Sequence, residues 1–124
     1  GAGVVAIFTG RLLAGEPCTI DGDGEQLKDY IYVGDIARAN VLALTRGAGE
    51  TLNIGVGEGT SVNTIYAALT AAAGISAEPR FGPPRVGDVR AFWLDTTRAR
   101  EVLGWQPEVT FDDGIRRTLE SFRR

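Results

Sequence analysis

The chain has 124 residues, of which 44% are hydrophobic and 23% are charged, a composition typical of one globular domain. The net charge of −3 and the lack of a basic block argue against nucleic acid or an anionic membrane surface as a partner. The sequence has no histidine and one cysteine, Cys18, which excludes a Ser-His-Asp triad, an intrachain disulfide and a thiolate metal site. No apolar run approaches the ~20 residues of a membrane helix, and we expect a cytoplasmic protein.

Hydrophobic periodicity, capping residues and glycine or proline breaks predict an alternation of helices and strands. In chain order, these are a helix over Val4–Leu13, strands over Cys18–Ile20 and Asp29–Val33, a helix over Ile36–Arg46, a strand over Thr51–Ile54, a helix over Ser61–Ala73, a strand over Glu78–Phe81, and helices over Thr96–Leu103 and Asp113–Arg123. Asp35, Thr60 or Ser61, and Thr110 are the expected N-caps. Trp93, Trp105 and Cys18 are expected to pack inside the protein. This alternation predicts an α/β fold.

A glycine-rich segment, Gly55-Val56-Gly57-Glu58-Gly59, lies between a predicted strand and a predicted helix. Glu78 follows about 20 residues later, as the acidic residue does in a dinucleotide-binding fingerprint. The third glycine, however, stands four residues after the first, where that fingerprint needs five. A tight turn with a positive φ angle is therefore the favoured interpretation.

Two groups of charged residues have both a binding and a structural interpretation. Lys28-Asp29 could bind an anion and orient a loop, or could lie in a solvated turn. Arg80, Arg85 and Arg90 flank a proline pair, and their guanidinium groups could bind phosphate oxygens or pair with local carboxylates. The residue pattern alone leaves these alternatives open.

Several segments, taken in order, resemble the NAD-dependent epimerase/dehydratase family, the extended short-chain dehydrogenases, and most closely its UDP-glucose 4-epimerase branch. The segments that carry this resemblance are Thr19–Ala37, Leu52–Gly55, Ser61-Val62, Arg85–Arg90, Leu94-Asp95, Leu103–Pro107 and Gly114-Ile115. Together they cover nearly the whole chain at the spacing of the family.

The resemblance implies a two-lobed enzyme whose N-terminal Rossmann lobe holds NAD and a catalytic Tyr-x-x-x-Lys pair. Residues 1–124 would be the C-terminal nucleotide-sugar-binding part, with 30–55 returning to the Rossmann sheet and the NAD-binding part absent. The only lysine, Lys28, has Gly24 four residues before it, so the chain contains no Tyr-x-x-x-Lys pair. We therefore expect the parent protein to be an enzyme and this chain alone to be inactive.

The resemblance also implies contacts with the diphosphate and the ribose. Arg85 and Asp88 match the positions that make these contacts in the family. Lys28 stands where the family usually has an arginine that also meets the diphosphate. A lysine there offers a point charge and cannot donate the two parallel hydrogen bonds that an arginine donates to a phosphate.

Other matched positions concern the nucleobase. The backbone of Thr19 to Asp21 matches the strand that lines the base. Asp21 itself replaces an aromatic residue that many members place against the base. Val4 and Val5 match the start of a helix that covers the base from the other side.

The function implied by the resemblance is nucleotide-diphosphate binding in an NAD-dependent epimerase acting on UDP-glucose or UDP-galactose. The alternatives are a fragment of a nucleotide-sugar 4,6-dehydratase or reductase, or a non-catalytic nucleotide-sugar-binding module. We expect a UDP-sugar as partner, no metal site, and a homodimer for the full-length protein. Open strand edges at 30–33 and 51–54 predict self-association or strand exchange of the chain alone.

Overall fold

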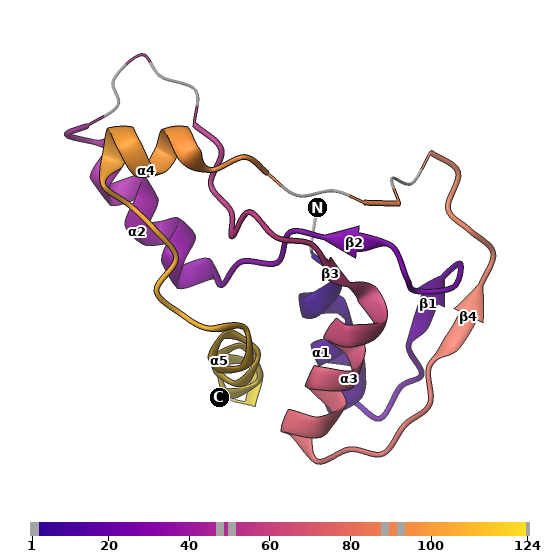
Figure 1. The fold of residues 1–124 in the computed structure, drawn as a ribbon. Coiled ribbons are helices and arrows are strands. Elements are labelled where there is room, and N and C mark those ends of the chain that lie inside the picture. Colours follow the sequence, from indigo (N-terminus) through magenta and orange to yellow (C-terminus); the bar gives the residue numbers. More distant parts are fainter. Residues whose placement is uncertain (1–2, 47–48, 50–51, 88–89, 92–93, 124) are drawn as a thin grey trace.

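The computed structural model describes residues 3–46, 49, 52–87, 90–91 and 94–123 (Figure 1). In chain order, the elements are α1 (Val4–Leu13), β1 (Thr19–Asp21), β2 (Leu27–Lys28), α2 (Val33–Ala43), β3 (Thr60–Ser61), α3 (Val62–Ala73), β4 (Arg80–Gly82), α4 (Thr97–Leu103) and α5 (Phe111–Arg123). Strands β1 and β4 pair in parallel, and β2 pairs antiparallel with β3. None of the helices in these described ranges has the length and apolar character needed to cross a membrane.

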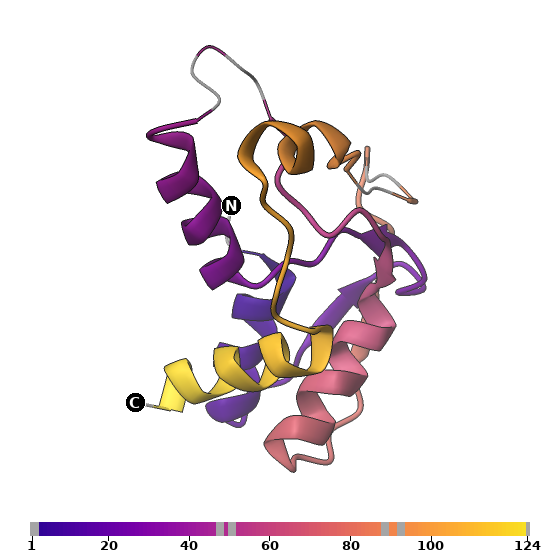
Figure 2. The ribbon, with the colours of Figure 1, turned by 60° about the vertical axis from the view of Figure 1, so that its left-hand side comes forward.

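The larger hydrophobic core lies among α1, α3 and α5, beside the β1–β4 pair. Val5, Phe8 and Leu12 recur at helical spacing and face this core. Phe8 meets Tyr66 of α3 edge to face, with ring centroids 5.5 Å apart. Figure 2 shows α5 crossing α1 and α3, and both helices contact it. This packing fixes the position of β1, whose Ile20 is buried in the same core.

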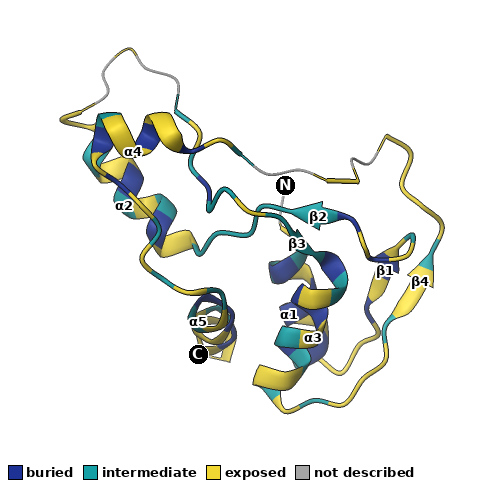
Figure 3. Ribbon diagram, viewed as in Figure 1, coloured by how far each residue is buried: buried dark blue, intermediate teal, exposed yellow. Residues whose placement is uncertain are grey.

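A second core joins α2 to α4 and centres on Trp105. The Trp105 side chain is fully buried among Ala39, Ala99 and Leu103. Its indole N–H donates to the Asp35 carbonyl at 3.0 Å, which satisfies the one polar atom of the buried ring. Figure 3 shows the buried residues of α2 and α4 on their facing sides. The predictions that Trp105 and Cys18 are buried are confirmed, whereas Trp93 lies outside the described residues.

The helix predictions hold where local signals decide the element. Helix α1 has the predicted bounds. Helix α3 begins after Ser61, whose hydroxyl accepts from the Thr64 N–H at 3.1 Å, and it ends at Gly74. Thr110 caps α5 by accepting from the Asp113 N–H at 3.2 Å.

Two strand predictions are wrong for the described residues. The strand expected at Asp29–Val33 is replaced by β2, which ends at Lys28, and α2 begins at Val33. The register pairs Lys28 with Thr60, so a longer β2 would have to pair with the residues just before Thr60, and these form no strand. Residues 52–54 form no strand either, and no described segment pairs with them.

The prediction that Asp35 caps α2 is also wrong. Asp35 lies in the first turn of α2, and the N-cap is Tyr32, whose side chain makes no capping hydrogen bond. The Asp35 carboxylate accepts instead from the N–H groups of Glu108 and Val109, both at 3.1 Å. The Asp35 carboxylate, which the local pattern assigns to the helix cap, is therefore bound to a distant segment of the chain.

Candidate functional site

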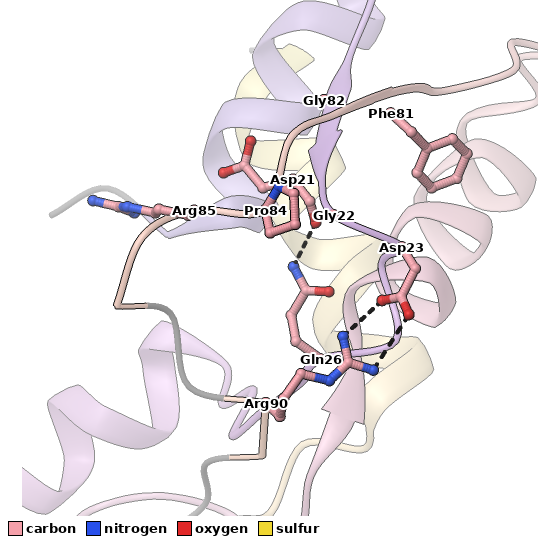
Figure 4. A pocket seen from close by; sticks show the side chains of 9 residues that line it. All are labelled: Asp21, Gly22, Asp23, Gln26, Phe81, Gly82, Pro84, Arg85 and Arg90. Carbon is pink, nitrogen blue, oxygen red and sulfur yellow. Dashed lines mark hydrogen bonds and ion pairs between the residues drawn. The ribbon is translucent and has the colours of Figure 1, made fainter.

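A pocket of about 620 Å³ opens where β1 and β4 end, between the turn after β1 and the loop after β4 (Figure 4). The residues that line it are Asp21, Gly22, Asp23, Gln26, Phe81, Gly82, Pro84, Arg85 and Arg90. Because β1 and β4 are parallel, their carboxyl ends meet at one edge, which is where open α/β sheets bind ligands. Two sequence-predicted site residues, Asp21 and Arg85, are thereby brought to one pocket.

Backbone pairing and one buried amide hold the inner wall of the pocket. The Gly22 N–H donates to the Gly82 carbonyl at 3.1 Å, which continues the β1–β4 pairing past the strands. Gln26 is only 6% exposed, and its side-chain Nε2 donates to the Asp21 carbonyl at 3.0 Å. Its Oε1 atom is buried without a hydrogen-bond partner among the described residues. The end of β1 is therefore held from both sides.

The arginines of the pocket have different partners. Arg90 forms an ion pair with Asp23, with its Nη1 2.8 Å from Oδ1 and its Nη2 3.4 Å from Oδ2. The hydrogen bond from Arg90, followed by one from the Glu25 N–H, holds the pKa of Asp23 below its ordinary value. Arg85 has no ion-pair or hydrogen-bond partner in the described part of the chain, and its side chain extends away from the Asp23–Arg90 pair (Figure 4). Arg90 thus pairs with a local carboxylate, whereas the hydrogen-bond donors of Arg85 are unused within the described residues.

The remaining sequence-predicted site residues do not line this pocket. Lys28 lies on β2, opposite Thr60 of β3. Thr19 is an exposed residue of β1. Val4 and Val5 begin α1, and the Val5 side chain is buried in the larger core. Asp88 lies outside the described residues, so its position stays a prediction.

Sequence reasoning missed Asp23 and Gln26 as pocket residues. Asp23 lies within the Gly22–Gly24 segment and Gln26 follows it two residues later, and as a local pattern this segment indicates only a turn. Asp23 and Arg90 are 67 positions apart, and no local pattern in one sequence links them. Phe81 and Pro84 belong to the β4 strand and the proline loop, so only the parallel β1–β4 pairing reveals their place.

The glycine-rich segment is a turn held by Asp29. Asp29 Oδ1 accepts from the Val56 N–H at 2.8 Å, and Oδ2 accepts from the Gly57 N–H at 3.0 Å. Asp29 Oδ2 also accepts from the Leu94 N–H at 3.1 Å, so this carboxylate orients two loops. Gly57 has a φ angle of +85°, which confirms the tight-turn interpretation. The solvated-turn interpretation is therefore wrong for Asp29.

The same contacts test whether this segment could hold NAD. A dinucleotide pyrophosphate needs free backbone N–H groups at such a turn. Here the N–H groups of Val56 and Gly57 are bound by the Asp29 carboxylate, which would also repel phosphate. These residues do not fit the pyrophosphate of NAD. The described residues likewise contain no group of three or more side chains suited to holding a metal ion.

Comparisons with known proteins identify the family to which the chain belongs. Residues 4–118 match the family described as GDP-mannose 4,6 dehydratase. The chain is 50% identical to the UDP-glucose 4-epimerase of Mycolicibacterium smegmatis over 123 residues, which cover 98% of this chain and 39% of that protein.

Two solved structures extend the comparison to the fold. The UDP-glucose 4-epimerase of Thermotoga maritima, solved with UDP-glucose, is 52% identical with a TM-score of 0.93, over 98% of this chain and 40% of that one. The Thermus thermophilus UDP-glucose 4-epimerase, solved with NAD, is 38% identical with a TM-score of 0.83, over 97% and 40% of the two chains. The chain thus spans about two fifths of the length of these relatives. It belongs to the GDP-mannose 4,6 dehydratase family and corresponds to the C-terminal part of extended short-chain dehydrogenase epimerases.

Proposed function

We propose that the chain is the part of an NAD-dependent nucleotide-sugar epimerase that binds the nucleoside diphosphate of a UDP-sugar. The observation that carries this proposal is the pocket at the carboxyl ends of β1 and β4. Arg85 lines it together with Asp21 at the end of β1, and the Arg85 guanidinium has no partner within the described residues. A guanidinium group donates two parallel hydrogen bonds to phosphate oxygens, which suits it to a diphosphate. The similarity to a Thermotoga maritima epimerase solved with UDP-glucose supports the choice of ligand.

Each predicted site residue has a role in this proposal. Arg85 binds the diphosphate, and Asp88 contacts the ribose. Lys28 adds a positive charge, while the backbone of Thr19 to Asp21 lines the base. Val4 and Val5 stay proposed contacts on the other face of the base, through the backbone at the start of α1, because the Val5 side chain is in the core.

The proposed contribution of this chain to catalysis is anchoring. Binding energy from the diphosphate, remote from the reacting sugar, holds the sugar in place for chemistry elsewhere. Asp29 occupies the N–H groups of the glycine-rich turn, so we place NAD and the catalytic groups in the part of the relatives that this chain does not match. The parent protein is then an enzyme, and this chain alone binds without turnover.

A second candidate keeps the pocket and changes the reaction. The matching family is described as GDP-mannose 4,6 dehydratase, and a 34% identical relative from Actinoplanes is a dTDP-glucose 4,6-dehydratase, so a dehydratase acting on a GDP- or dTDP-sugar is the specific alternative. The same Arg85 would bind the diphosphate in that case. Because the two candidates differ in the base, nucleotide preference distinguishes them.

Replacing Arg85 tests the proposal directly. Arg85→Ala removes a charge-assisted hydrogen-bonding group worth about 1.5–3 kcal/mol, so we expect UDP to bind roughly 10- to 100-fold more weakly by calorimetry. Arg80→Ala is the matched control, because Arg80 is exposed on β4 and does not line the pocket. An unchanged UDP dissociation constant for Arg85→Ala would contradict the assignment.

A further inference from the structure

The loop that carries Arg85, here called the Arg85 loop, runs from Gly82 at the end of β4 to Arg90 and contacts the segment containing β1 and β2 at both of these ends. At its first end, the Gly82 carbonyl accepts from the Gly22 N–H at 3.1 Å. At its second end, the Arg90 carbonyl accepts from the Leu27 N–H at 2.7 Å, and Leu27 also pairs with Ala91 in an isolated parallel bridge. The two ends of this loop, at Gly82 and Arg90, are therefore each joined by backbone contacts to the segment that contains β1 and β2.

A side-chain ion pair reinforces the second of these points. The Arg90 guanidinium approaches both oxygens of the Asp23 carboxylate, at 2.8 and 3.4 Å, and the two side chains point toward each other across the pocket rim (Figure 4). A planar fork on a carboxylate fixes orientation as well as distance. Arg90 is thereby held by its backbone on β2 and by its side chain on the turn between β1 and β2.

Asp23 is itself well fixed. Its Oδ1 accepts from the Glu25 N–H at 3.0 Å, and its carbonyl accepts from Asn63 Nδ2 at 2.9 Å. Asn63 belongs to α3, which packs in the larger core. Helix α3 of the larger core therefore helps to fix Asp23, and Asp23 in turn fixes Arg90 at the end of the Arg85 loop.

We propose that Asp23 and Arg90, which also line the pocket, are positioning residues whose ion pair holds the Arg85 loop in the geometry that binds a nucleoside diphosphate. The inference rests on the proposed function and adds two residues to its site. A loop held in its binding conformation loses less conformational entropy when the ligand binds. Both side chains are about two-thirds exposed, at 66% and 60%, so the effect is modest. Exposed pairs of this kind support an affinity change of about two- to fivefold.

Two single variants and their double variant test the pair. Asp23→Asn removes the charge and keeps an oxygen that can accept from the Glu25 N–H, while Arg90→Gln removes the guanidinium. We expect each to weaken UDP binding about two- to fivefold, and the double variant to be no weaker than the weaker single variant, because both remove the same interaction. Asp113→Asn is the matched control, because Asp113 forms an exposed 2.8 Å ion pair with Arg116 on α5, outside the pocket.

Amide hydrogen exchange gives a readout that does not depend on ligand. The Leu27 N–H, which donates to the Arg90 carbonyl, should exchange faster in Asp23→Asn and Arg90→Gln than in wild type, and at the wild-type rate in the control.

Tighter UDP binding by Asp23→Asn would overturn the proposal, since Arg90 would then bind phosphate in competition with Asp23. Unchanged affinity or unchanged Leu27 exchange in both single variants would also overturn it. A wild-type chain that binds no UDP would contradict the proposed function, while Leu27 exchange would still decide whether the pair holds the loop.

Discussion

Two aspartates, Asp29 and Asp35, show how single carboxylates hold distant segments of this chain together. Asp29 binds the backbone N–H groups of Val56, Gly57 and Leu94. Asp35 is 3% exposed and binds two consecutive N–H groups in the segment between α4 and α5. Each carboxylate supplies acceptors to loop N–H groups that have no helix or strand partner, which would otherwise be costly where they are buried.

The stability of the chain should depend strongly on Asp35. Asp35→Ala leaves two N–H groups without acceptors, so we expect the free energy of unfolding to fall by about 3 kcal/mol in urea denaturation. Asp35→Asn, which keeps one acceptor oxygen, should lose less. Asp112→Ala is the control, because Asp112 is an exposed residue of α5. A loss for Asp35→Ala no greater than that of the control would contradict this role.

Among the larger elements, the glycine-rich turn depends on close contact with Asp29. A Cβ atom at position 55 would lie 2.7 Å from Asp29 Oδ2, so Gly55→Ala must displace this carboxylate. We expect a loss of about 1–3 kcal/mol in the free energy of unfolding, measured by urea denaturation. Gly3→Ala is the matched control, since nothing lies within 4 Å of a Cβ at position 3. Equal stability of the two variants would contradict the proposed role of the Asp29 contact.

The helices could be predicted from sequence where neighbouring residues decide them. The apolar spacing of α1, the Ser61 cap of α3 and the Thr110 cap of α5 are local signals, and the structure confirms all three. The strand at Asp29–Val33 could not be judged locally, because a strand requires a partner and β3 offers only two residues. The prediction that Asp35 caps α2 failed for a similar reason, because its carboxylate accepts hydrogen bonds from residues more than 70 positions away.

The candidate site could be predicted in part. The resemblance to a family singled out Arg85 and Asp21, and both line one pocket. It could not reveal Asp23, Gln26 or their contacts, because these depend on the parallel pairing of β1 with β4 and on the return of the chain at Arg90. Single-sequence patterns contain no signal for such long-range contacts.

Across the molecule, two cores support two different surfaces. The core of α1, α3 and α5 supports the pocket, whereas the core around Trp105 supports α2. Helix α2 exposes Val33 and Val41 at 68% and 65%, and Leu44 just beyond it at 83%. The predicted homodimer and strand exchange stay predictions. The strands that would exchange are not formed in the described residues.

We expect this chain to bind a nucleoside diphosphate and not to bind NAD. Calorimetric titration of the chain with UDP, dTDP, GDP and NAD tests both halves of that expectation. The proposed site predicts saturable binding of UDP, weaker binding of the other two diphosphates, and no binding of NAD. Preference for GDP or dTDP would favour the dehydratase alternative. Binding of NAD, or of none of the four nucleotides, would contradict the placement of the ligand between β1 and the Arg85 loop.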